Sequence, residues 1–361
     1  MQAYDIAIIG LGPAGSIFAT HLNKRFKAIA LDKKMPLTNS GFCKPCGGLL
    51  APDAQRALSR FNMTLPKEIL VDPQIFSVRT IDIKSGLTRH YQRHYINLDR
   101  HKFDMWLVDN IPDHIEIQDG AACTDIIREN SGGFRISYIA GSKTETIWAP
   151  YIVGADGANS IVRRKLFKNF KIHKYLSIQQ WFADAHDTPF YSCIFDPVIT
   201  DSYAWGLTKD EHFIFGGAFN IKTGKQDFEL MKQKLAPFGF QLENPVKTEA
   251  CLVLRPFGAR NYCYGGEDAF LIGEAAGFIS PSSLEGISYA IDSGYLLSQC
   301  FNKTENNDSP FWQYRRGTRK IRLKLLSKYL KRPFIYHPMS RKIVMKTGMA
   351  AIKIHSNAKI W

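Results

Sequence analysis

The sequence from residue 4 to residue 32, YDIAIIGLGPAGSIFATHLNKRFKAIALD, decides the fold. Its first apolar run, residues 6–9, has the length and composition of a buried parallel strand. Glycines follow at positions 10, 12 and 15, and an apolar pattern with helical spacing comes next. A second apolar run, residues 28–31, ends in Asp32. This order predicts a strand, a glycine turn, a helix and a second strand.

Each part of this stretch has a physical role in binding a nucleotide. Gly10 permits a tight turn, Gly12 lets a pyrophosphate approach the backbone, and Gly15 lets the helix pack closely on the strand. Free N–H groups at the start of the helix favour an anion, and Asp32 is placed to accept hydrogen bonds from ribose hydroxyls. A glycine fingerprint alone is weak evidence, but one framed by strand, helix and acid predicts a dinucleotide site.

The length and composition indicate a globular protein. At 361 residues the chain is long enough for two domains, or for one large domain with an inserted lobe. No stretch approaches the roughly 20 uncharged apolar residues that a membrane span requires, and we expect no signal peptide. Seven cysteines, an odd number, argue against a disulfide framework and favour a reducing compartment. We therefore expect a cytoplasmic protein.

The net charge of +14 is concentrated at one end of the chain. Residues 311–361 contain fourteen Lys or Arg and no Asp or Glu, which leaves 33 basic and 33 acidic residues in 1–310. Between residues 315 and 332, Ile321, Leu325 and Tyr329 recur at helical spacing, with Leu326 and Leu330 beside them. This pattern predicts a basic amphipathic helix that lies on an anionic membrane.

Two other uses of this segment stay open. Nucleic-acid binding is an alternative use of such charge, but no recognition motif accompanies it, and we expect no nucleic-acid partner. The second alternative is a helix that covers the substrate lobe and exposes its basic face to solvent. A second apolar stretch, residues 343–354, adds to the membrane interpretation. We expect a location on the inner face of the cytoplasmic membrane.

The rest of the chain alternates between strand-like and helix-like patterns. Helices are expected at residues 53–61, at 226–238, from near Glu285, and from about 311 onward. The sequence NLDRHKFD at 97–104 is expected to open another helix. Strands are expected at 75–95, 115–155, 176–220, 250–256 and 269–272. This order suggests a nucleotide domain that is interrupted by a β-rich lobe.

Three separated segments then carry a family resemblance. They are the fingerprint at 10–15, GADGANSIVR at 154–163 and FLIGEAAG at 270–277. Their combination resembles FAD-dependent oxidoreductases of the p-hydroxybenzoate hydroxylase type, and most closely the geranylgeranyl reductase-like branch. The resemblance runs from residue 4 to about residue 300.

The resemblance implies an α/β fold. It consists of a Rossmann-type FAD-binding domain, as in p-hydroxybenzoate hydroxylase and glutathione reductase, with an inserted mixed β-sheet substrate lobe and a C-terminal helical segment. The FAD-binding domain is expected at residues 1–74, 96–170 and 252–300. The substrate lobe is expected at 75–95 and 171–251, and the basic helical segment at 301–361.

The resemblance also implies the residues that bind FAD. The first motif would hold the ADP part, the second would lie beside the pyrophosphate, and the third would contact the ribityl chain, with Glu274 in place of the usual Asp. Arg100, in an Arg-x-x-Phe-Asp pattern, corresponds to an arginine that reaches FAD. The full predicted set is Gly10, Gly12, Pro13, Ala14, Gly15, Asp32, Lys33, Cys46, Gly47, Arg100, Asp156, Gly157, Gly273, Glu274, Gly277, Gly286 and Ile287.

Two further features are similar to the reductase branch. The loop KPCGG at 44–48 resembles one that these reductases place near the flavin ring. Tyr203 and Trp205 resemble part of their Tyr-x-Trp-x-Phe-Pro motif, although Leu207 and Thr208 replace Phe-Pro. Tyr203 and Trp205 alternate along a strand, so both side chains are expected on the same side, against a long apolar substrate. Cys46, Tyr203 and Trp205 are the predicted catalytic residues.

The spacing of Cys43 and Cys46 permits three interpretations. A redox pair is one, because this spacing and the neighbouring Lys44 lower the pKa of a thiol. A zinc site is the second, but no second pair of Cys or His with ligand spacing accompanies it, and we expect no metal. The favoured interpretation is that Cys46 lies near the flavin and that Cys43 is a coincidental neighbour.

The activity implied by the resemblance is hydride transfer from reduced FAD to a carbon–carbon double bond of an isoprenoid or other lipid. The flavin supplies the chemistry and the protein supplies orientation. NAD(P)H or a redox protein would reduce the flavin, and Cys46, Tyr203 or a water would supply the proton. Two alternatives stay open: a flavin-dependent monooxygenase on an apolar or aromatic substrate, and a non-catalytic flavin- and lipid-binding resistance or regulatory protein.

Overall fold

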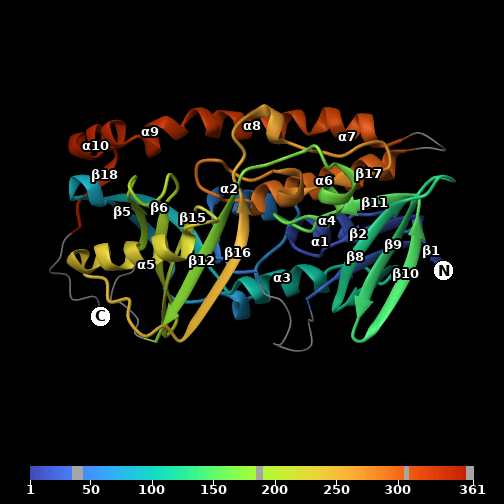
Figure 1. Ribbon diagram of the computed structural model, residues 1–361, viewed down its shortest axis with the longest axis horizontal. Helices are drawn as coiled ribbons and strands as arrows, with labels where there is room; N and C mark the ends of the chain where they lie inside the picture. Colours follow the sequence, from blue (N-terminus) through green and yellow to red (C-terminus); the bar gives the residue numbers. More distant parts are fainter. Residues whose placement is uncertain (35–43, 184–189, 305–308, 355–361) are drawn as a thin grey trace.

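The computed structural model describes residues 1–34, 44–183, 190–304 and 309–354 (Figure 1). Three β-sheets and the helices around them make up this part of the chain. The parallel sheet has the order β17-β11-β2-β3-β7, with β17 at Ala269–Leu271, β11 at Tyr151–Gly154, β2 at Ile6–Ile9, β3 at Ala28–Asp32 and β7 at Ile115–Asp119. Its central strands are buried on both faces, as the apolar runs predict.

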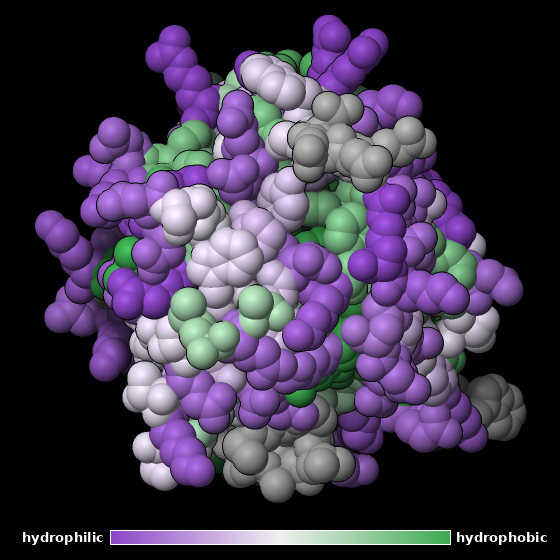
Figure 2. Space-filling view, turned by 90° about the vertical axis from the view of Figure 1, so that its right-hand side faces the viewer, coloured by the Kyte–Doolittle hydropathy of each residue, from purple (hydrophilic) through white to green (hydrophobic). Residues whose placement is uncertain are grey.

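The two faces of the parallel sheet are covered differently. Ile6 and Ile8 pack with helices α1 (Pro13–Thr20) and α6 (Ile287–Lys303). Ala7 and Ile9 point to the opposite face, because successive side chains of a strand alternate. That face is covered by a four-stranded sheet of β1 (Gln2–Ala3), β10 (Lys143–Ala149), β9 (Phe134–Ala140) and β8 (Ala121–Arg128). Figure 2 views the molecule from the end at which this four-stranded sheet lies, and hydrophilic residues cover most of the surface there.

The largest sheet has nine strands and is mixed. Its order is β16 (Lys247–Leu254), β12 (Lys174–Phe182), β15 (His212–Phe219), β14 (Ala204–Lys209), β13 (Tyr191–Phe195), β5 (Ile75–Asp82), β6 (Leu87–Asn97) and β18 (Ala351–Ile352), and β4 (Leu49–Leu50) also pairs with β6. Neighbours are antiparallel except for β13 and β5. Helix α5 (Gly224–Leu235) buries Phe228, Met231 and Leu235 against this sheet. The expected domain boundaries stay a prediction.

Helix α2 (Pro52–Ser59) lies between β4 and β5 of the nine-stranded sheet, and helices α3 (Arg100–Asp109) and α4 (Ile161–Leu166) connect strands of different sheets. Asp99 caps α3, since its side chain accepts hydrogen bonds from the backbone N–H groups of His101 and Lys102. Several expected bounds were displaced by a few residues. Helix α5 begins at 224 and ends at 235, where a 3₁₀ turn continues it to 238. Strand β16 begins at 247 rather than 250 and ends at 254.

The C-terminal segment crosses one side of the molecule as consecutive helices (Figure 1). They are α7 (Phe311–Gly317), α8 (Arg319–Leu330), α9 (Arg332–Tyr336) and α10 (Pro338–Thr347). The prediction of one amphipathic helix with a membrane-facing stripe was wrong in its orientation. Ile321 and Leu325 are buried in the protein core, so that stripe holds α8 on the body. None of the described helices has the length and apolar character needed to cross a membrane.

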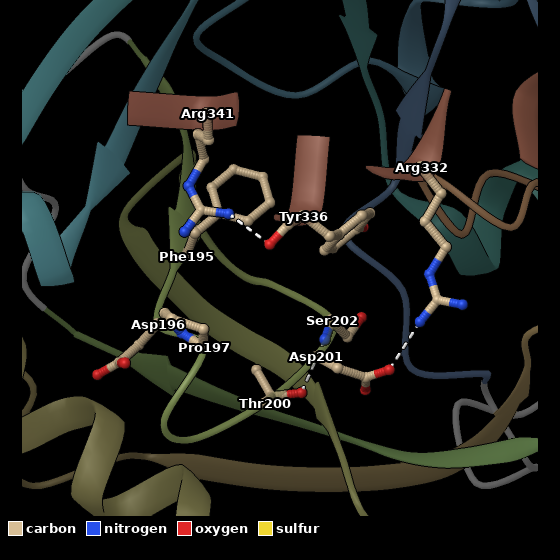
Figure 3. Close-up of a pocket in the computed structure, with 9 residues that line it drawn as sticks. All are labelled: Phe195, Asp196, Pro197, Thr200, Asp201, Ser202, Arg332, Tyr336 and Arg341. Carbon is tan, nitrogen blue, oxygen red and sulfur yellow. Dashed lines mark hydrogen bonds and ion pairs between the residues drawn. The ribbon is translucent and has the colours of Figure 1, made fainter. Parts of the chain in front are cut away.

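Ion pairs attach the C-terminal helices to the nine-stranded sheet. Arg332 Nη2 lies 2.8 Å from Asp201 Oδ2, and the Arg341 guanidinium lies 4.7 Å from the centre of the Phe195 ring (Figure 3). Arg341 also pairs with Asp82 at 3.2 Å, and both side chains are buried. Phe195, Asp201, Arg332 and Arg341 line a cavity of about 110 Å³. Part of the segment's positive charge therefore neutralises acids of the body.

Candidate active site

Three glycine-containing turns meet at the carboxyl edge of the parallel sheet. A Cβ on Gly15 would lie 1.9 Å from the carbonyl oxygen of Gly10, and one on Gly10 would lie 2.8 Å from that of Ala155. A Cβ on Gly273 would lie 2.9 Å from the side chain of Ala14. The structure therefore brings together the motifs at 10–15, 154–163 and 270–277, and the close approach requires glycine at Gly10 and Gly15.

Open space lies beside the same turns. Apart from their chain neighbours, no heavy atom of the described residues lies within 4 Å of the Cβ positions of Gly12 and Gly157. Gly12 is the N-cap of α1 and has no side-chain hydrogen bond to the first turn, so free N–H groups of this helix face the open space. An anion is stabilised at such a helix start. These turns fit the pyrophosphate of a dinucleotide such as FAD.

The acidic residues of the first two motifs are held by backbone groups. Asp32 is buried at the end of β3, where its carboxylate accepts from Leu11 N and, at 2.8 Å, from Lys34 N. Asp156 Oδ2 accepts from Ile161 N at 2.6 Å. The second oxygen of Asp156 is buried and has no protein partner in the described residues. Burial raises the pKa of this carboxyl, and a donor from a bound cofactor would satisfy the free oxygen.

The third motif is turned toward the loop at 44–48. Glu274 forms an ion pair with Lys44 Nζ through Oε2, and its Oε1 accepts from Leu254 N at 2.9 Å. Both carboxylate oxygens of Glu274 therefore have protein partners. The contact of Glu274 with the ribityl chain stays a prediction. Gly277 has a positive φ of 82°, and Gly286 is the N-cap of α6, which begins at Ile287, near Glu285 as predicted.

A buried chain of charges connects the nucleotide strand to the loop at 44–48. Lys34 Nζ lies 3.6 Å from Asp32 Oδ2 and 3.5 Å from Asp104 Oδ2. Asp104 accepts from Arg100 Nε at 2.9 Å and from Arg100 Nη2 at 3.4 Å. Sequence reasoning missed Lys34 and Asp104, although the four-residue spacing of Arg100 and Asp104 on a helix was a visible signal. The predicted reach of Arg100 to FAD stays a prediction.

Cys46 lies at the end of this chain of charges. Gly48 N lies 3.5 Å from its Sγ. Burial raises the pKa of the thiol, but the positive charges of Arg100 and Lys44 and the Gly48 N–H outweigh burial and leave the pKa below its usual value. Cys46 carries no disulfide in the described part of the chain. Cys43, and with it the redox-pair interpretation, lies outside the described residues.

Tyr203 and Trp205 point to the same side of the nine-stranded sheet, and their ring centres lie 5.7 Å apart. Trp205 extends toward the loop at 44–48, because a Cβ on Gly47 would lie 3.9 Å from its indole nitrogen. Gly216 leaves room for this ring, since a Cβ there would lie 2.7 Å from it. The Tyr203 hydroxyl donates to the carbonyl oxygen of Ser283 at 2.6 Å. Burial raises the pKa of the Tyr203 phenol well above its usual value.

A cavity of about 430 Å³ begins at Tyr203 and runs between the nine-stranded sheet and the C-terminal helices. Tyr91, Tyr95, Tyr191 and Cys193 line it from the strands. The remaining lining comes mainly from β5, the turn at 282–285 and helices α8, α9 and α10. Sequence reasoning missed these tyrosines, because they come from strands that only the fold brings together. Among the residues that the structure describes, no group of three metal-ligating side chains occurs.

The predicted site residues therefore fall into two neighbouring groups. The glycine turns with Pro13, Ala14, Asp32, Lys33 and Asp156 form the first, at the carboxyl edge of the parallel sheet. Cys46, Gly47, Tyr203 and Trp205 form the second, beside the cavity. Glu274 connects the two groups through Lys44, and Arg100 connects them through Asp104 and Lys34. The arrangement suits a dinucleotide that extends from the sheet edge toward the loop at 44–48.

Comparison with solved structures defines the class of fold. A geranylgeranyl bacteriochlorophyll reductase-like protein from Thermoplasma acidophilum matches with a TM-score of 0.79 and 17% identity, over 100% of this chain and 94% of that one. PqsL, described as a probable FAD-dependent monooxygenase from Pseudomonas aeruginosa, matches with a TM-score of 0.68 and 12% identity, over 96% of this chain and 99% of that one. The protein has the fold of the FAD-dependent oxidoreductases of the geranylgeranyl reductase-like type, as predicted.

Comparison with curated proteins identifies the family. Protein CbrA of Escherichia coli O157:H7 is 50% identical over 353 residues, which cover 98% of this chain and 99% of that protein. Protein CbrA of Shigella flexneri serotype 5b is also 50% identical, over 98% of this chain and 95% of that protein. The chain belongs to the CbrA family. No family model matches it.

Proposed function

We propose that the protein is an FAD-dependent oxidoreductase that reduces carbon–carbon double bonds of an isoprenoid or polyprenyl lipid at the inner face of the cytoplasmic membrane. The observation that carries the proposal is the position of Trp205. Its ring contacts Tyr203, at the inner end of the cavity, and its indole nitrogen reaches the position of Gly47 in the predicted flavin loop. A long apolar chain in the cavity would therefore end beside the flavin.

Bound FAD would supply hydride transfer, and the described residues would hold and orient it. Gly12, Gly157 and the start of α1 would hold the pyrophosphate, and Asp32 would accept from the ribose. The loop at 44–48, fixed by the Lys44–Glu274 ion pair, would position Cys46 and Gly47 beside the isoalloxazine ring.

Tyr203 is the better placed of the two candidate proton donors. Its hydroxyl is at the cavity wall and stays protonated at neutral pH, since burial raises its pKa. Cys46 is outside the cavity lining, so its thiol is farther from the proposed substrate. We infer that Tyr203 delivers the proton and that Trp205 orients the substrate.

The size and lining of the cavity support a lipid substrate. Its volume of about 430 Å³ is within the range of small-molecule sites. Aromatic rings such as Tyr91 and Tyr191 suit an unsaturated chain, which has a polarisable surface and no hydrogen-bonding groups. A nicotinamide cofactor or a redox protein would reduce the flavin from outside.

The test is a reduction assay with defined substrates. The purified protein, loaded with FAD and reduced with dithionite without oxygen, is incubated with polyprenyl phosphates, and the products are analysed by mass spectrometry. The proposal predicts a gain of two hydrogen atoms for each saturated double bond, and a loss of this activity in Tyr203→Phe with FAD retained. Products that instead gain oxygen when air is admitted would assign the protein to the monooxygenases, whose fold it shares. A lipid that binds unchanged under both conditions would favour a non-catalytic role.

A further inference from the structure

The C-terminal helices and the turn after α10 expose several large apolar side chains. Leu330, Phe334, Met339, Ile343 and Met349 are 64%, 68%, 69%, 61% and 69% exposed. Isolated exposed apolar residues are common, but a concentration on one surface marks an interaction site. We define the docking face as the exposed side chains of residues 330–349.

The exposure is a property of folded helices that are attached to the body. On α10, Arg341 is 5% exposed and Met345 is 1% exposed, and they lie one turn apart on the inner side. Arg89 Nε donates to the carbonyl oxygen of Met345 at 2.8 Å, and β18 continues the sheet beyond the helix. Met339 and Ile343 are therefore exposed because α10 already has a packed inner side.

The docking face is also strongly basic. Residues 311–361 hold fourteen Lys or Arg and no acid. Arg332 and Arg341 pair with acids of the body, as described above. Lys331, Lys342 and Lys346 are exposed, and no carboxylate of the described residues lies within 4 Å of their amino groups. This arrangement is complementary to a surface that is both anionic and apolar, which a bilayer of acidic phospholipids is.

The large cavity opens on the same face. Phe334, Ile335 and Val344 line the cavity and are 68%, 36% and 39% exposed, so they form its rim together with the exposed Lys331 and Arg93. The buried Tyr203 lies at the other end. The opening is therefore surrounded by the apolar and basic groups of the docking face.

We propose that the docking face lies on an anionic bilayer, with the rim of the cavity toward the lipid. Apolar rim residues enter the interface, and Lys331, Lys342 and Lys346 bind the acidic head groups. A lipid chain then passes from the bilayer into the cavity without crossing water. The identity of the cavity occupant rests on the proposed function, but the docking itself does not.

Vesicle co-sedimentation tests whether the lysines of the docking face bind acidic head groups. We expect the whole protein to bind vesicles that contain phosphatidylglycerol, and to bind phosphatidylcholine vesicles weakly. Each surface cation contributes about 1 kcal/mol, or about fivefold in binding. The loss of three positive charges alone should therefore weaken binding of the triple variant Lys331→Glu, Lys342→Glu, Lys346→Glu by on the order of a hundredfold, and the added carboxylates should weaken it further. The matched control is Lys67→Glu, Lys143→Glu, Lys168→Glu, at exposed lysines outside the segment, and it should bind almost normally.

Bromolipid quenching tests the orientation. The fluorescence of the Phe334→Trp variant should be quenched by vesicles of brominated phosphatidylglycerol more strongly than that of the native protein. The control is Phe76→Trp, at a residue that is 66% exposed on β5, and its fluorescence should be quenched no more than that of the native protein. Thermal denaturation and circular dichroism show whether each variant is folded.

Three results would overturn the proposal: equal binding to both kinds of vesicle, equal loss in the charge variant and its control, or equal quenching at 334 and 76. Strong binding to DNA with no binding to vesicles would also overturn it. A protein that holds FAD and reduces detergent-dispersed lipid but does not bind vesicles would contradict the docking and the membrane location, and would keep the proposed reduction. A protein that binds anionic vesicles but reduces no lipid would contradict the proposed reduction and keep the docking.

Discussion

Replacement of Asp104 by Asn should destabilise the protein strongly, because Asp104 is the shared acid of two buried cations. Its carboxylate binds Arg100 at 2.9 Å and lies 3.5 Å from Lys34. The side chains of Asp104, Arg100 and Lys34 are 5%, 11% and 8% exposed. Asp104→Asn keeps the shape of the side chain but leaves both cations without this charge. Removing one member of a buried ion pair costs about 3–5 kcal/mol.

The assay is equilibrium unfolding in urea at pH 7, with matched FAD content because a bound ligand adds to the apparent stability. Asp268→Asn is the control, since Asp268 pairs with Arg128 at 2.7 Å with side chains 39% and 50% exposed. An exposed pair contributes about 0–1 kcal/mol. A loss in Asp104→Asn that is no larger than the loss in the control would refute the reasoning.

The pH dependence gives a second check on the same residue. Burial raises the pKa of Asp104, but Arg100 and Lys34 outweigh burial, so its pKa in the folded protein is below the usual 3.8. A carboxyl with a lowered pKa contributes stability above its unfolded pKa, and this contribution is lost as the pH falls through the folded value. The difference between the native protein and Asp104→Asn should therefore be full at pH 7 and shrink below about pH 4.

Three further predictions test the site. Iodoacetamide at pH 7.5 should label Cys46 faster than Cys193 or Cys251, because the pKa of Cys46 is lowered while burial raises the pKa values of the other two to about 12 and about 11. Equal labelling rates in peptide mapping would contradict the lowered pKa of Cys46. Gly12→Ala should fold with a stability within about 1 kcal/mol of the native value but lose FAD, since its Cβ would enter open space where the pyrophosphate is expected; unchanged flavin absorbance would contradict this placement. Cys193→Trp should fill the cavity and abolish lipid reduction while FAD is retained, and full activity would show that the substrate lies elsewhere.

The nucleotide-binding half of the fold was predictable because its signals are local. The strand, the turn at Gly10 and Gly15, and the helix follow one another within the first motif, and each residue type is required by the backbone there. The fold class was predictable once the segments at 154–163 and 270–277 were combined with this first motif. Individual helix and strand ends were displaced by a few residues because tertiary contacts determine where an element ends.

The interior of the site was less predictable because it depends on contacts between distant segments. Lys34 and Asp104 meet only after β3 and α3 are packed together, and Tyr91 and Tyr191 share a cavity only because β5 lies between their strands. The orientation of α8 was wrong for a related reason. The spacing of Ile321 and Leu325 shows that one helix face is buried, but a protein core and a membrane give the same spacing.

The most direct test of the proposed function is anaerobic reoxidation of the reduced flavin. The purified protein is reduced until its visible flavin bands bleach, and a polyprenyl phosphate is then added without oxygen. The account predicts that the bands return at a rate that depends on the lipid concentration, and that they return far more slowly in Cys193→Trp. A colourless protein that takes up no FAD, or bands that return only when oxygen is admitted, would contradict it.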